Sequence, residues 1–181
     1  MKRNAGFTLM ELMIAISIIT ILSTIAVPSF YYMNNLRITQ SQIENLQRTL
    51  SMARQMALAK NRQTIVCPSG DGSTCNNDND WSYGYMAYID RNRDGDFNDA
   101  QDQLIEYIPG VRNVATRKDT SSFSHKLTGS RSEVKFSAQG AALETNQTLT
   151  YCDGNQKTKF EVVINLQGRI EVRKLPEMSC S

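Results

Sequence analysis

The chain has 181 residues, 40% of them hydrophobic and 21% charged, with 20 basic and 18 acidic side chains. This length is enough for one modest domain in addition to an N-terminal segment. Without Lys2 and Arg3, the chain would have 18 basic and 18 acidic side chains. This near-neutral net charge argues against nucleic-acid binding through bulk charge.

A basic pair and a glycine precede a long apolar run. Lys2 and Arg3 come before Gly6, and the run over 7–27 contains a single charge, Glu11. As a helix this run covers roughly 30 Å, the thickness of the hydrocarbon core of a bilayer. A secretory signal would end in a small-x-small cleavage site, and no such site follows this run. We therefore predict a membrane-spanning helix with its basic N-terminal side in the cytoplasm.

Glu11 is the unusual residue of this run. A carboxylate near the centre of a membrane helix costs on the order of 2–3 kcal/mol, so its presence predicts a partner. Cleavage between Gly6 and Phe7 would create an α-amine within one helical turn of Glu11. That amine could pair with Glu11 in the same helix or in a neighbouring, staggered one.

The segment Gly6-Phe7-Thr8-Leu9-x-Glu11-Leu12 closely resembles the class III signal of type IV pilins and type II secretion pseudopilins. The resemblance implies that a prepilin peptidase cuts after Gly6 and that Phe7 becomes N-methylated. It also implies that Glu11 docks the subunit in a filament by neutralising the Phe7 amine of a neighbour. The alternative is a single-span anchor with a stray glutamate.

Pro28 ends the apolar run and removes a backbone donor, so we expect one helix that is interrupted or kinked there. In the pilin family, the helix melts at such a proline in assembled filaments. Over 28–60, apolar residues recur at helical spacing and predict an amphipathic helix with one buried stripe, ending near Asn61. The stripe consists of Leu36, Ile43, Leu46, Leu50, Ala53 and Ala57.

After Asn61, short alternating runs separated by Gly, Asn, Asp and Ser predict strands. The candidates are Thr64–Cys67, Tyr83–Ile89, Gln103–Ile108, Glu133–Ser137, Thr148–Cys152, Phe160–Asn165 and Arg169–Lys174. Gly168 lies in the short link between the last two and predicts a hairpin. Residues 117–132 read as an exposed loop. The order predicts an α+β fold, with a long helix followed by an antiparallel β domain over 61–181.

Four cysteines lie beyond the predicted span, in an oxidising compartment, and predict two disulfides. Three pairings are open in principle. We favour Cys67–Cys75, which closes a tight loop, and Cys152–Cys180, which ties down the C-terminus. The chain-entropy relation gives ~2.6 and ~3.6 kcal/mol for the two bridges. A metal site at the first pair is the alternative, but no histidine or further cysteine lies near it in sequence.

Three internal segments extend the resemblance over nearly the whole chain. Residues 81–95, 149–153 and 164–170 look like the signatures of the FimU/FimT-like minor pilins and H-type pseudopilins. The resemblance implies a type IV pilin fold, in which two small sheets pack on the helix. It also implies a cleaved leader over 1–6 and a filament-core helix over 7–27.

An acidic turn offers a candidate metal site. Asp90, Asn92, Asp94 and Asp96 match the first half of an EF-hand calcium loop, including the glycine at its sixth position. The twelfth position is Gln101, where a bidentate glutamate is required. Because short Asx side chains also cap β-turns, we favour a turn over calcium, and we expect no other cofactor.

No hydrolytic site is visible, so we predict that the chain is not an enzyme. His125 is the only histidine and stands in a serine-rich stretch, where we expect it to be solvated. No serine is surrounded by the glycine pattern of a nucleophile elbow.

Part of the resembled family, the FimT-like branch, binds DNA through a C-terminal Gly-Arg-x-Arg motif. Here Glu171 replaces the second arginine of that motif, between Arg169 and Arg173 on one strand face. We expect this acid to form cross-strand ion pairs and to dilute the attraction for phosphate, although Lys174 could extend a basic patch. DNA binding is therefore the less favoured reading.

The resemblance implies a minor pilin of a type IV pilus, most similar to the FimU-like members. It would start in the bacterial inner membrane with a periplasmic C-terminus, enter the pilus near its tip and prime assembly, in machinery for twitching motility, adhesion and DNA uptake. Implied partners are the major pilin, other minor pilins, a tip adhesin, the prepilin peptidase and the inner-membrane assembly platform. The alternatives are a DNA-binding pilin of natural transformation and an H-type pseudopilin of type II secretion.

Overall fold

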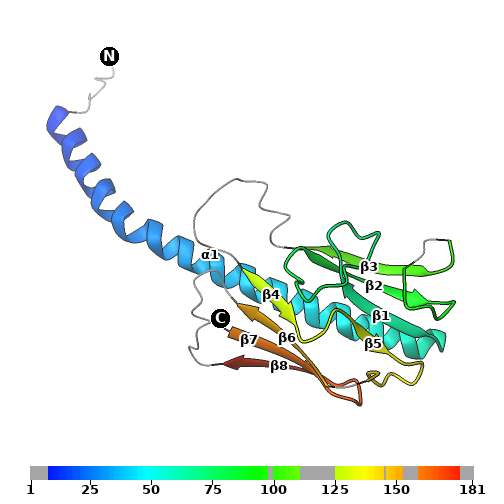
Figure 1. Cartoon of the computed structure of the whole chain (residues 1–181). Coiled ribbons are helices and arrows are strands. Elements are labelled where there is room, and N and C mark those ends of the chain that lie inside the picture. Colours follow the sequence, from blue (N-terminus) through cyan, green and yellow to red (C-terminus); the bar gives the residue numbers. More distant parts are fainter. Residues whose placement is uncertain (1–7, 98–99, 111–124, 145, 153–158, 176–181) are drawn as a thin grey trace. The chain divides into compact units, whose positions relative to one another are not determined.

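The computed structural model describes residues 8–97, 100–110, 125–144, 146–152 and 159–175 (Figure 1). The chain divides into two compact units, Met1–Ile38 and Thr39–Ser181. In the described residues one helix, α1 (Leu9–Lys60), is followed by eight strands. The α+β order predicted from the sequence is therefore confirmed.

Helix α1 runs through Pro28 without a break in its secondary structure. The interruption expected there is absent, because one missing donor leaves the hydrogen bonds of the neighbouring turns in place. At the other end, Asn61 adopts a left-handed conformation with φ 50°. The amides of Asn61 and Arg62 donate to the carbonyls of Leu58 (3.4 Å) and Ala57 (3.2 Å). This pair of bonds is the Schellman arrangement, and it ends the helix where the sequence predicted.

The predicted apolar stripe is buried in the second unit. Ile43, Leu46, Leu50, Ala53 and Ala57 are 0–6% exposed. Leu36, which belongs to the first unit, is 37% exposed and does not continue the stripe. Five of the six positions therefore form the helical side of the core.

The strands form two four-stranded antiparallel sheets. The first has the order β3-β2-β1-β5 and the second the order β4-β6-β7-β8. The first sheet contains β1 (Gln63–Pro68), β2 (Gly84–Asp90), β3 (Gln103–Pro109) and β5 (Val134–Phe136). The second contains β4 (Lys126–Gly129), β6 (Gln147–Cys152), β7 (Lys159–Ile164) and β8 (Ile170–Leu175).

Strand β4 lies inside the stretch that we expected to be a loop, so that expectation is wrong for residues 126–129. Leu127 is the only large apolar side chain of this four-residue strand, so the sequence shows no alternation there. Its pairing with β6 and the bridge from Asp80 to Thr128 hold it in place. Both contacts are distant in sequence, which explains why a local pattern misses the strand.

The main core lies between the buried stripe of α1 and the inner faces of both sheets (Figure 1). Trp81 and Tyr85 are its largest members, each 1% exposed, with ring centroids 6.2 Å apart. A second, smaller cluster consists of Ile65, Cys67, Met86 and Tyr88, with Cys75, Phe97 and Tyr107 packed against it. Since neighbouring strand residues point to opposite faces, Ile65 and Cys67 place this cluster on the outer face of the first sheet.

Candidate functional site

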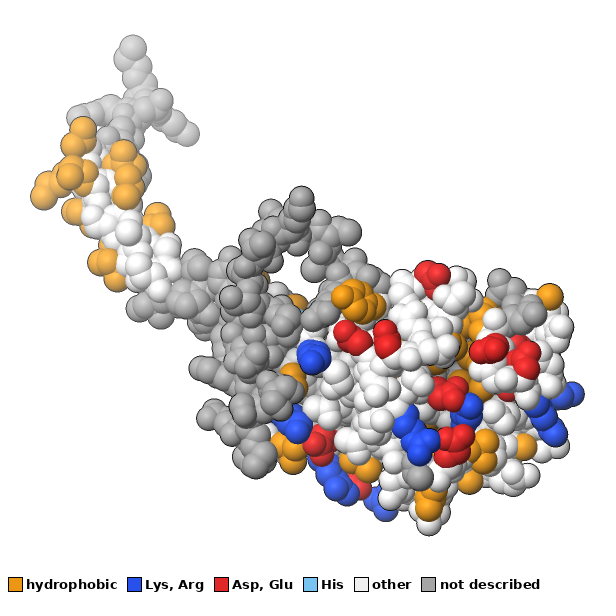
Figure 2. Space-filling model, in the orientation of Figure 1, with side chains coloured by type: hydrophobic (Ala, Val, Ile, Leu, Met, Phe, Trp, Pro, Cys, Tyr) orange, Lys and Arg blue, Asp and Glu red, His pale blue; other side chains and the backbone are white. Residues whose placement is uncertain are grey.

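The N-terminal segment of α1 exposes apolar side chains, and Figure 2 shows those on one of its faces. Ten of them are 52–78% exposed: Leu9, Met10, Leu12, Met13, Ile14, Ile16, Ile18, Ile19, Ile21 and Leu22. A helix that is apolar all round is buried in its working state, because so much apolar surface is unfavourable in water. Over the described residues, no helix combines the length and the apolar character needed to cross a membrane.

Glu11 has a role at this end of the helix that the sequence interpretation missed. The amide of Glu11 donates to Thr8 Oγ1 at 3.2 Å, and the amide of Thr8 faces Glu11 Oε2 at 3.5 Å. This reciprocal pair is a capping box, and the Thr-x-x-Glu spacing could have revealed it. The carboxylate also lies in the first turn, where the helix dipole favours negative charge. Gly6 and Phe7, on which the predicted processing and docking depend, lie outside the described residues.

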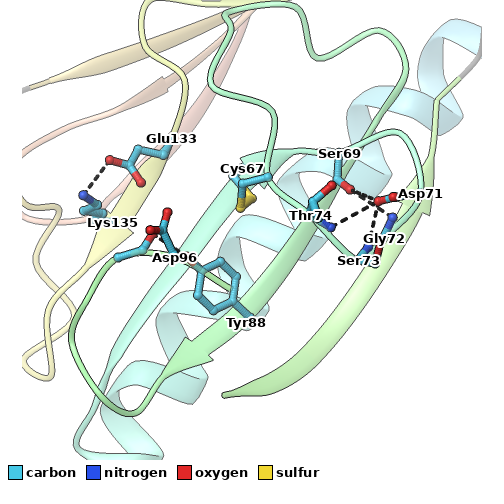
Figure 3. The surroundings of a disulfide bond; sticks show 12 residues. Cys67, Ser69, Asp71, Gly72, Ser73, Thr74, Tyr88, Asp96, Glu133 and Lys135 are labelled. Atoms are coloured by element: carbon cyan, nitrogen blue, oxygen red, sulfur yellow. Dashed lines mark hydrogen bonds and ion pairs between the residues drawn. A yellow bond between two sulfur atoms is a disulfide. The ribbon is translucent and has the colours of Figure 1, made fainter. Parts of the chain in front are cut away.

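The disulfide Cys67–Cys75 is confirmed, with a Cα–Cα distance of 5.6 Å (Figure 3). Inside its loop, Asp71 Oδ1 accepts hydrogen bonds from the amides of Ser73 (2.8 Å) and Thr74 (3.1 Å) and from the Ser69 hydroxyl (3.2 Å). These donors, the Ser73 amide first among them, lower the pKa of Asp71 to about 2. The loop is therefore held by its own polar groups as well as by the covalent bond.

The same loop rests on strand β3. The Tyr107 hydroxyl donates to the Gly70 carbonyl at 2.8 Å, and a Cβ on Gly72 would lie 2.7 Å from the Tyr107 ring. Gly72 also has φ 76°, so both its space and its conformation call for glycine. In the second predicted bridge, Cys152 is disulfide-bonded, while Cys180 lies outside the described residues.

The acidic turn after β2 has the geometry of Asx turns. The buried carboxylate of Asp90 accepts hydrogen bonds from the amides of Arg93 and Gly95, and the Asp96 amide donates to Asp94 Oδ1 at 2.9 Å. Burial raises the pKa of Asp90, and the two amide donors oppose that rise. Asn92 donates to Asp94 and, at 2.9 Å, to Gln101.

The turn therefore uses its own side-chain oxygens to fix its backbone. No group of three or more His, Cys, Asp or Glu side chains placed to hold a metal ion occurs in the part of the chain that the structure describes.

The outward face of β8, together with Arg169 directly before the strand, carries the charges that the sequence placed there. Arg169, Glu171 and Arg173 are exposed, and they alternate with the partly buried Ile170 and Val172. Glu171 Oε2 accepts a hydrogen bond from Arg173 at 2.9 Å. This ion pair lies along one strand rather than across two, so the expected cross-strand pairing is wrong at Glu171.

Glu171 lies between two arginines that act on its charge. The hydrogen bond and charge of Arg173, with a smaller contribution from Arg169, lower the pKa of Glu171. Glu171 is therefore a carboxylate at neutral pH and neutralises part of the basic charge around it. Lys174 follows on the same strand and is exposed.

His125 is buried, contrary to the solvated position that we expected. It is 8% exposed, its Nδ1 lies 2.8 Å from the Tyr151 hydroxyl, and the two rings are stacked. Tyr151 belongs to β6, so this contact spans the β4–β6 pair and stabilises the second sheet. The polar local sequence gave no sign of it, because the partner lies 26 residues away.

Comparison with known proteins identifies two matching regions. The family model described as Type II transport protein GspH matches residues 42–168, and the model of the prokaryotic N-terminal methylation motif matches residues 1–27. No curated protein matches the chain.

Three solved structures are similar to the chain. Two are crystal forms of the type IV minor pilin FimU of Pseudomonas aeruginosa PAO1. One has 19% identity and a TM-score of 0.58 and covers 80% of this chain and 96% of that one. The other has 21% identity and a TM-score of 0.54, with coverages of 78% and 99%. The minor pseudopilin EpsH of the Vibrio cholerae type 2 secretion system has 12% identity, a TM-score of 0.48 and coverages of 76% and 96%. At these identities the FimU likeness bears on the fold alone.

Proposed function

Because the chain belongs to the GspH family of type II transport proteins, whose model covers most of its length, we propose that it is a minor pilin of a type IV pilus. The family consists of structural subunits of pili and pseudopili, and this chain is not an enzyme. It carries the methylation motif at its N-terminus and has a pilin fold. The proposal adds a position near the filament tip, where the subunit primes assembly and links other minor pilins to the major pilin.

The observation that carries this proposal is the N-terminal segment of α1. Ten large apolar side chains surround a segment with one carboxylate, and they face solvent in the isolated chain. In a filament, the corresponding segments of neighbouring subunits bundle and cover this surface. Glu11 then selects the docking register, because a carboxylate in an apolar bundle needs a positive partner. The methylated amine of Phe7 is the partner that we propose.

The proposed life cycle has two stages. The precursor is held in the inner membrane by its N-terminal segment, with the β domain in the periplasm, and prepilin peptidase cuts after Gly6. The assembly platform then transfers the subunit to the pilus, where it contacts the major pilin, other minor pilins and a tip adhesin. The disulfide supports this location, because such bonds persist in oxidising compartments.

Two variants test the proposal in cells that make pili. Gly6→Ala should block processing, seen as an uncleaved precursor on a gel. Glu11→Ala should be processed but should be depleted from sheared pili, measured by mass spectrometry against the major pilin. A normal pilus content of Glu11→Ala would refute the docking role, and a mature protein that still carries residues 1–6 would refute the proposal from its first step.

A second candidate function is DNA binding in natural transformation. Arg169 and Lys174 favour it, since both are exposed and neither forms an ion pair within the described residues. Removing a basic side chain that contacts a phosphate should weaken DNA binding at low salt and reduce the salt dependence of the affinity. Arg169→Ala should therefore lower affinity for duplex DNA, and equal affinities of wild type and variant would exclude this site.

A role as H-type pseudopilin remains the third candidate. It predicts that the chain copurifies with type II secretion components rather than with sheared pili, so the same mass spectrometry separates the two filaments.

A further inference from the structure

The four edge strands of the two sheets are not equally protected. The outer edge of β4 is covered, because the amides of Trp81 and Gly129 bond the carbonyls of Leu127 (2.8 Å) and Asn79 (2.9 Å) across it. The outer edge of β5 is covered in the same way. There the amides of Leu143 and Ser137 bond the carbonyls of Lys135 and Ala141, both at 2.8 Å.

Strand β3 has no strand on its outer side in the part of the chain that the structure describes, but it is irregular. Its pairing with β2 shifts register between Ala87 and Tyr88, and the strand ends at Pro109. A bulge and a proline are the devices by which natural sheets prevent another strand from adding to an edge.

Within the described residues, strand β8 has no covering segment and no bulge, and its protection consists of the charges of Glu171, Arg173 and Lys174. It pairs with β7 in six consecutive steps without a bulge, from Ile164↔Ile170 to Lys159↔Leu175. It contains no proline and has no strand on its other side. The unpaired N–H and C=O groups of such an edge can template the addition of a further strand, and the charged side chains of β8 restrict which strand can add.

The hairpin fixes which backbone groups of β8 lie on the free edge. The Asn165 amide donates to the Arg169 carbonyl at 3.1 Å, so Arg169 belongs to the set that bonds toward β7. Hydrogen-bonded and non-bonded residues alternate along an antiparallel pair. The N–H and C=O groups of Ile170, Val172 and Lys174 therefore point away from β7.

The side chains of β8 are also only partly covered. Ile170 and Val172 pack against the main core but remain partly exposed. On the other face, Glu171 is paired with Arg173, which leaves Arg169 without an ion pair in the described structure. The strand thus offers a backbone ladder, an incomplete apolar face and a small excess of positive charge.

From this combination, we propose that β8 accepts an extended segment of a neighbouring filament subunit as an added strand, with an acidic residue opposite Arg169. Main-chain hydrogen bonds supply the affinity in this mode, and the side chains supply the specificity. The charges choose the partner, because opposite charges on directly facing strand residues are favourable and like charges are not. The proposal rests on the filament function above and names the surface that it uses.

DNA is the less suitable occupant of this strand. A phosphate backbone has no alternating N–H and C=O groups with which to satisfy the edge of Ile170, Val172 and Lys174. Glu171, which carries a negative charge at neutral pH, repels phosphates between the two arginines.

Lys174 allows a test with a matched control. Lys174→Pro removes an outward amide while the bonds from β8 to β7 remain, since proline is tolerated where an edge N–H faces solvent. Lys174→Ala removes the same charge and keeps the amide. Each is combined with Glu171→p-benzoyl-phenylalanine in the full-length chain, and pilus-producing cells are irradiated.

The proposal expects an adduct with another filament subunit, located by mass spectrometry in an extended segment with an acidic residue. Lys174→Ala should keep this adduct, and Lys174→Pro should reduce it by about threefold to tenfold, the effect of one hydrogen bond. Equal adducts from both variants, an adduct with DNA, or no adduct in a subunit that is present in sheared pili would overturn it. Absence of the chain from pili would instead refute the proposed function.

Hydrogen exchange provides a second measurement that does not depend on the proline variant. In the isolated full-length chain, the amides of Glu171 and Arg173 should be protected and those of Val172 and Lys174 should exchange freely. In pili, all four should be protected. Free exchange of Val172 and Lys174 in both states would show that no strand is added.

Discussion

The Cys67–Cys75 bridge leads to a quantitative prediction about stability. Cys75→Ser breaks the bridge, leaves Cys67 in place as a buried thiol, 1% exposed, and puts a side chain of similar size at the partly buried position of Cys75. With a sequence separation of 8, the chain-entropy relation gives about 2.6 kcal/mol for the lost constraint. For a domain of this size, that corresponds to a melting temperature lower by roughly 5–10 °C.

The measurement is thermal unfolding of the full-length chain in detergent, followed by near-UV circular dichroism. Asn77→Ser is the matched control, because it lies just beyond the same loop and is exposed. Adding a reductant to the wild type should lower the melting temperature by more than Cys75→Ser does, because it opens the bridge of Cys152 as well as the Cys67–Cys75 bridge. A shift of Cys75→Ser no larger than that of Asn77→Ser would refute the reasoning, because the polar bonds of the loop would then hold it unaided.

Three further substitutions test the disulfide loop, the hydrogen bonds from Arg54 to two loop carbonyls, and the C-terminal end of α1. Asp71 has a lowered pKa, so its contribution to stability is present above its unfolded pKa and is lost as the pH falls toward about 2; Asp71→Asn should flatten this acid dependence between about pH 4 and pH 2 in a pH series of unfolding curves. Arg54 donates to the carbonyls of Gly140 (2.8 Å) and Gln167 (2.9 Å), so Arg54→Ala should lower the free energy of unfolding by about 2–3 kcal/mol in urea titrations. Asn61→Ala should cost about 1 kcal/mol in the same assay, while Asn61→Gly should be close to neutral, because the left-handed conformation suits glycine.

Each of these predictions has a comparison that would contradict it. An unchanged acid dependence in Asp71→Asn would mean that the loop amides do not depend on the carboxylate. Gln55→Ala, at an exposed position next to Arg54, should change the free energy of unfolding little. An equal loss from both variants would mean that the two carbonyl bonds of Arg54 do not carry the effect. Equal stabilities of Asn61→Ala and Asn61→Gly would show that the helix end is not strained.

The sequence predicted the elements whose signals are local. The spacing of Ile43, Leu46 and Leu50 fixed one face of α1, and the glycine at Gly168 fixed the β7–β8 hairpin. The short spacing between two cysteines predicted the first disulfide. Each of these features depends on residues within a few positions of one another, so a single sequence is enough to reveal them.

The features that the sequence did not predict are those decided by distant partners. Strand β4 forms because Thr128 bridges Asp80 and Leu127 pairs with Tyr151. His125 is buried because it contacts Tyr151, which lies on strand β6 and is distant in sequence. The same cause explains the edge of β8, since an edge is defined by which strands are absent beside it in the described fold.

The capping box changes how the docking role of Glu11 should be tested. In the isolated chain, Glu11 Oε2 already faces the Thr8 amide. The free energy that Glu11 contributes to docking is therefore only the difference between this contact and a pairing with an amine in the apolar bundle. Glu11→Ala removes both interactions and cannot separate them. A cap of this kind contributes about 0.5–2 kcal/mol, and a glutamine serves in a capping box as well as a glutamate does.

Glu11→Gln is therefore the discriminating variant. It keeps the cap but carries no charge with which to neutralise an amine, so the helix should form normally while the pilus content of the subunit falls to the level of Glu11→Ala. Thr8→Ser is the matched control, because it keeps the capping oxygen and the charge, and it should assemble like the wild type. If Glu11→Gln is incorporated normally, the filament requires the cap and not the charge, and the proposed pairing with the Phe7 amine is wrong.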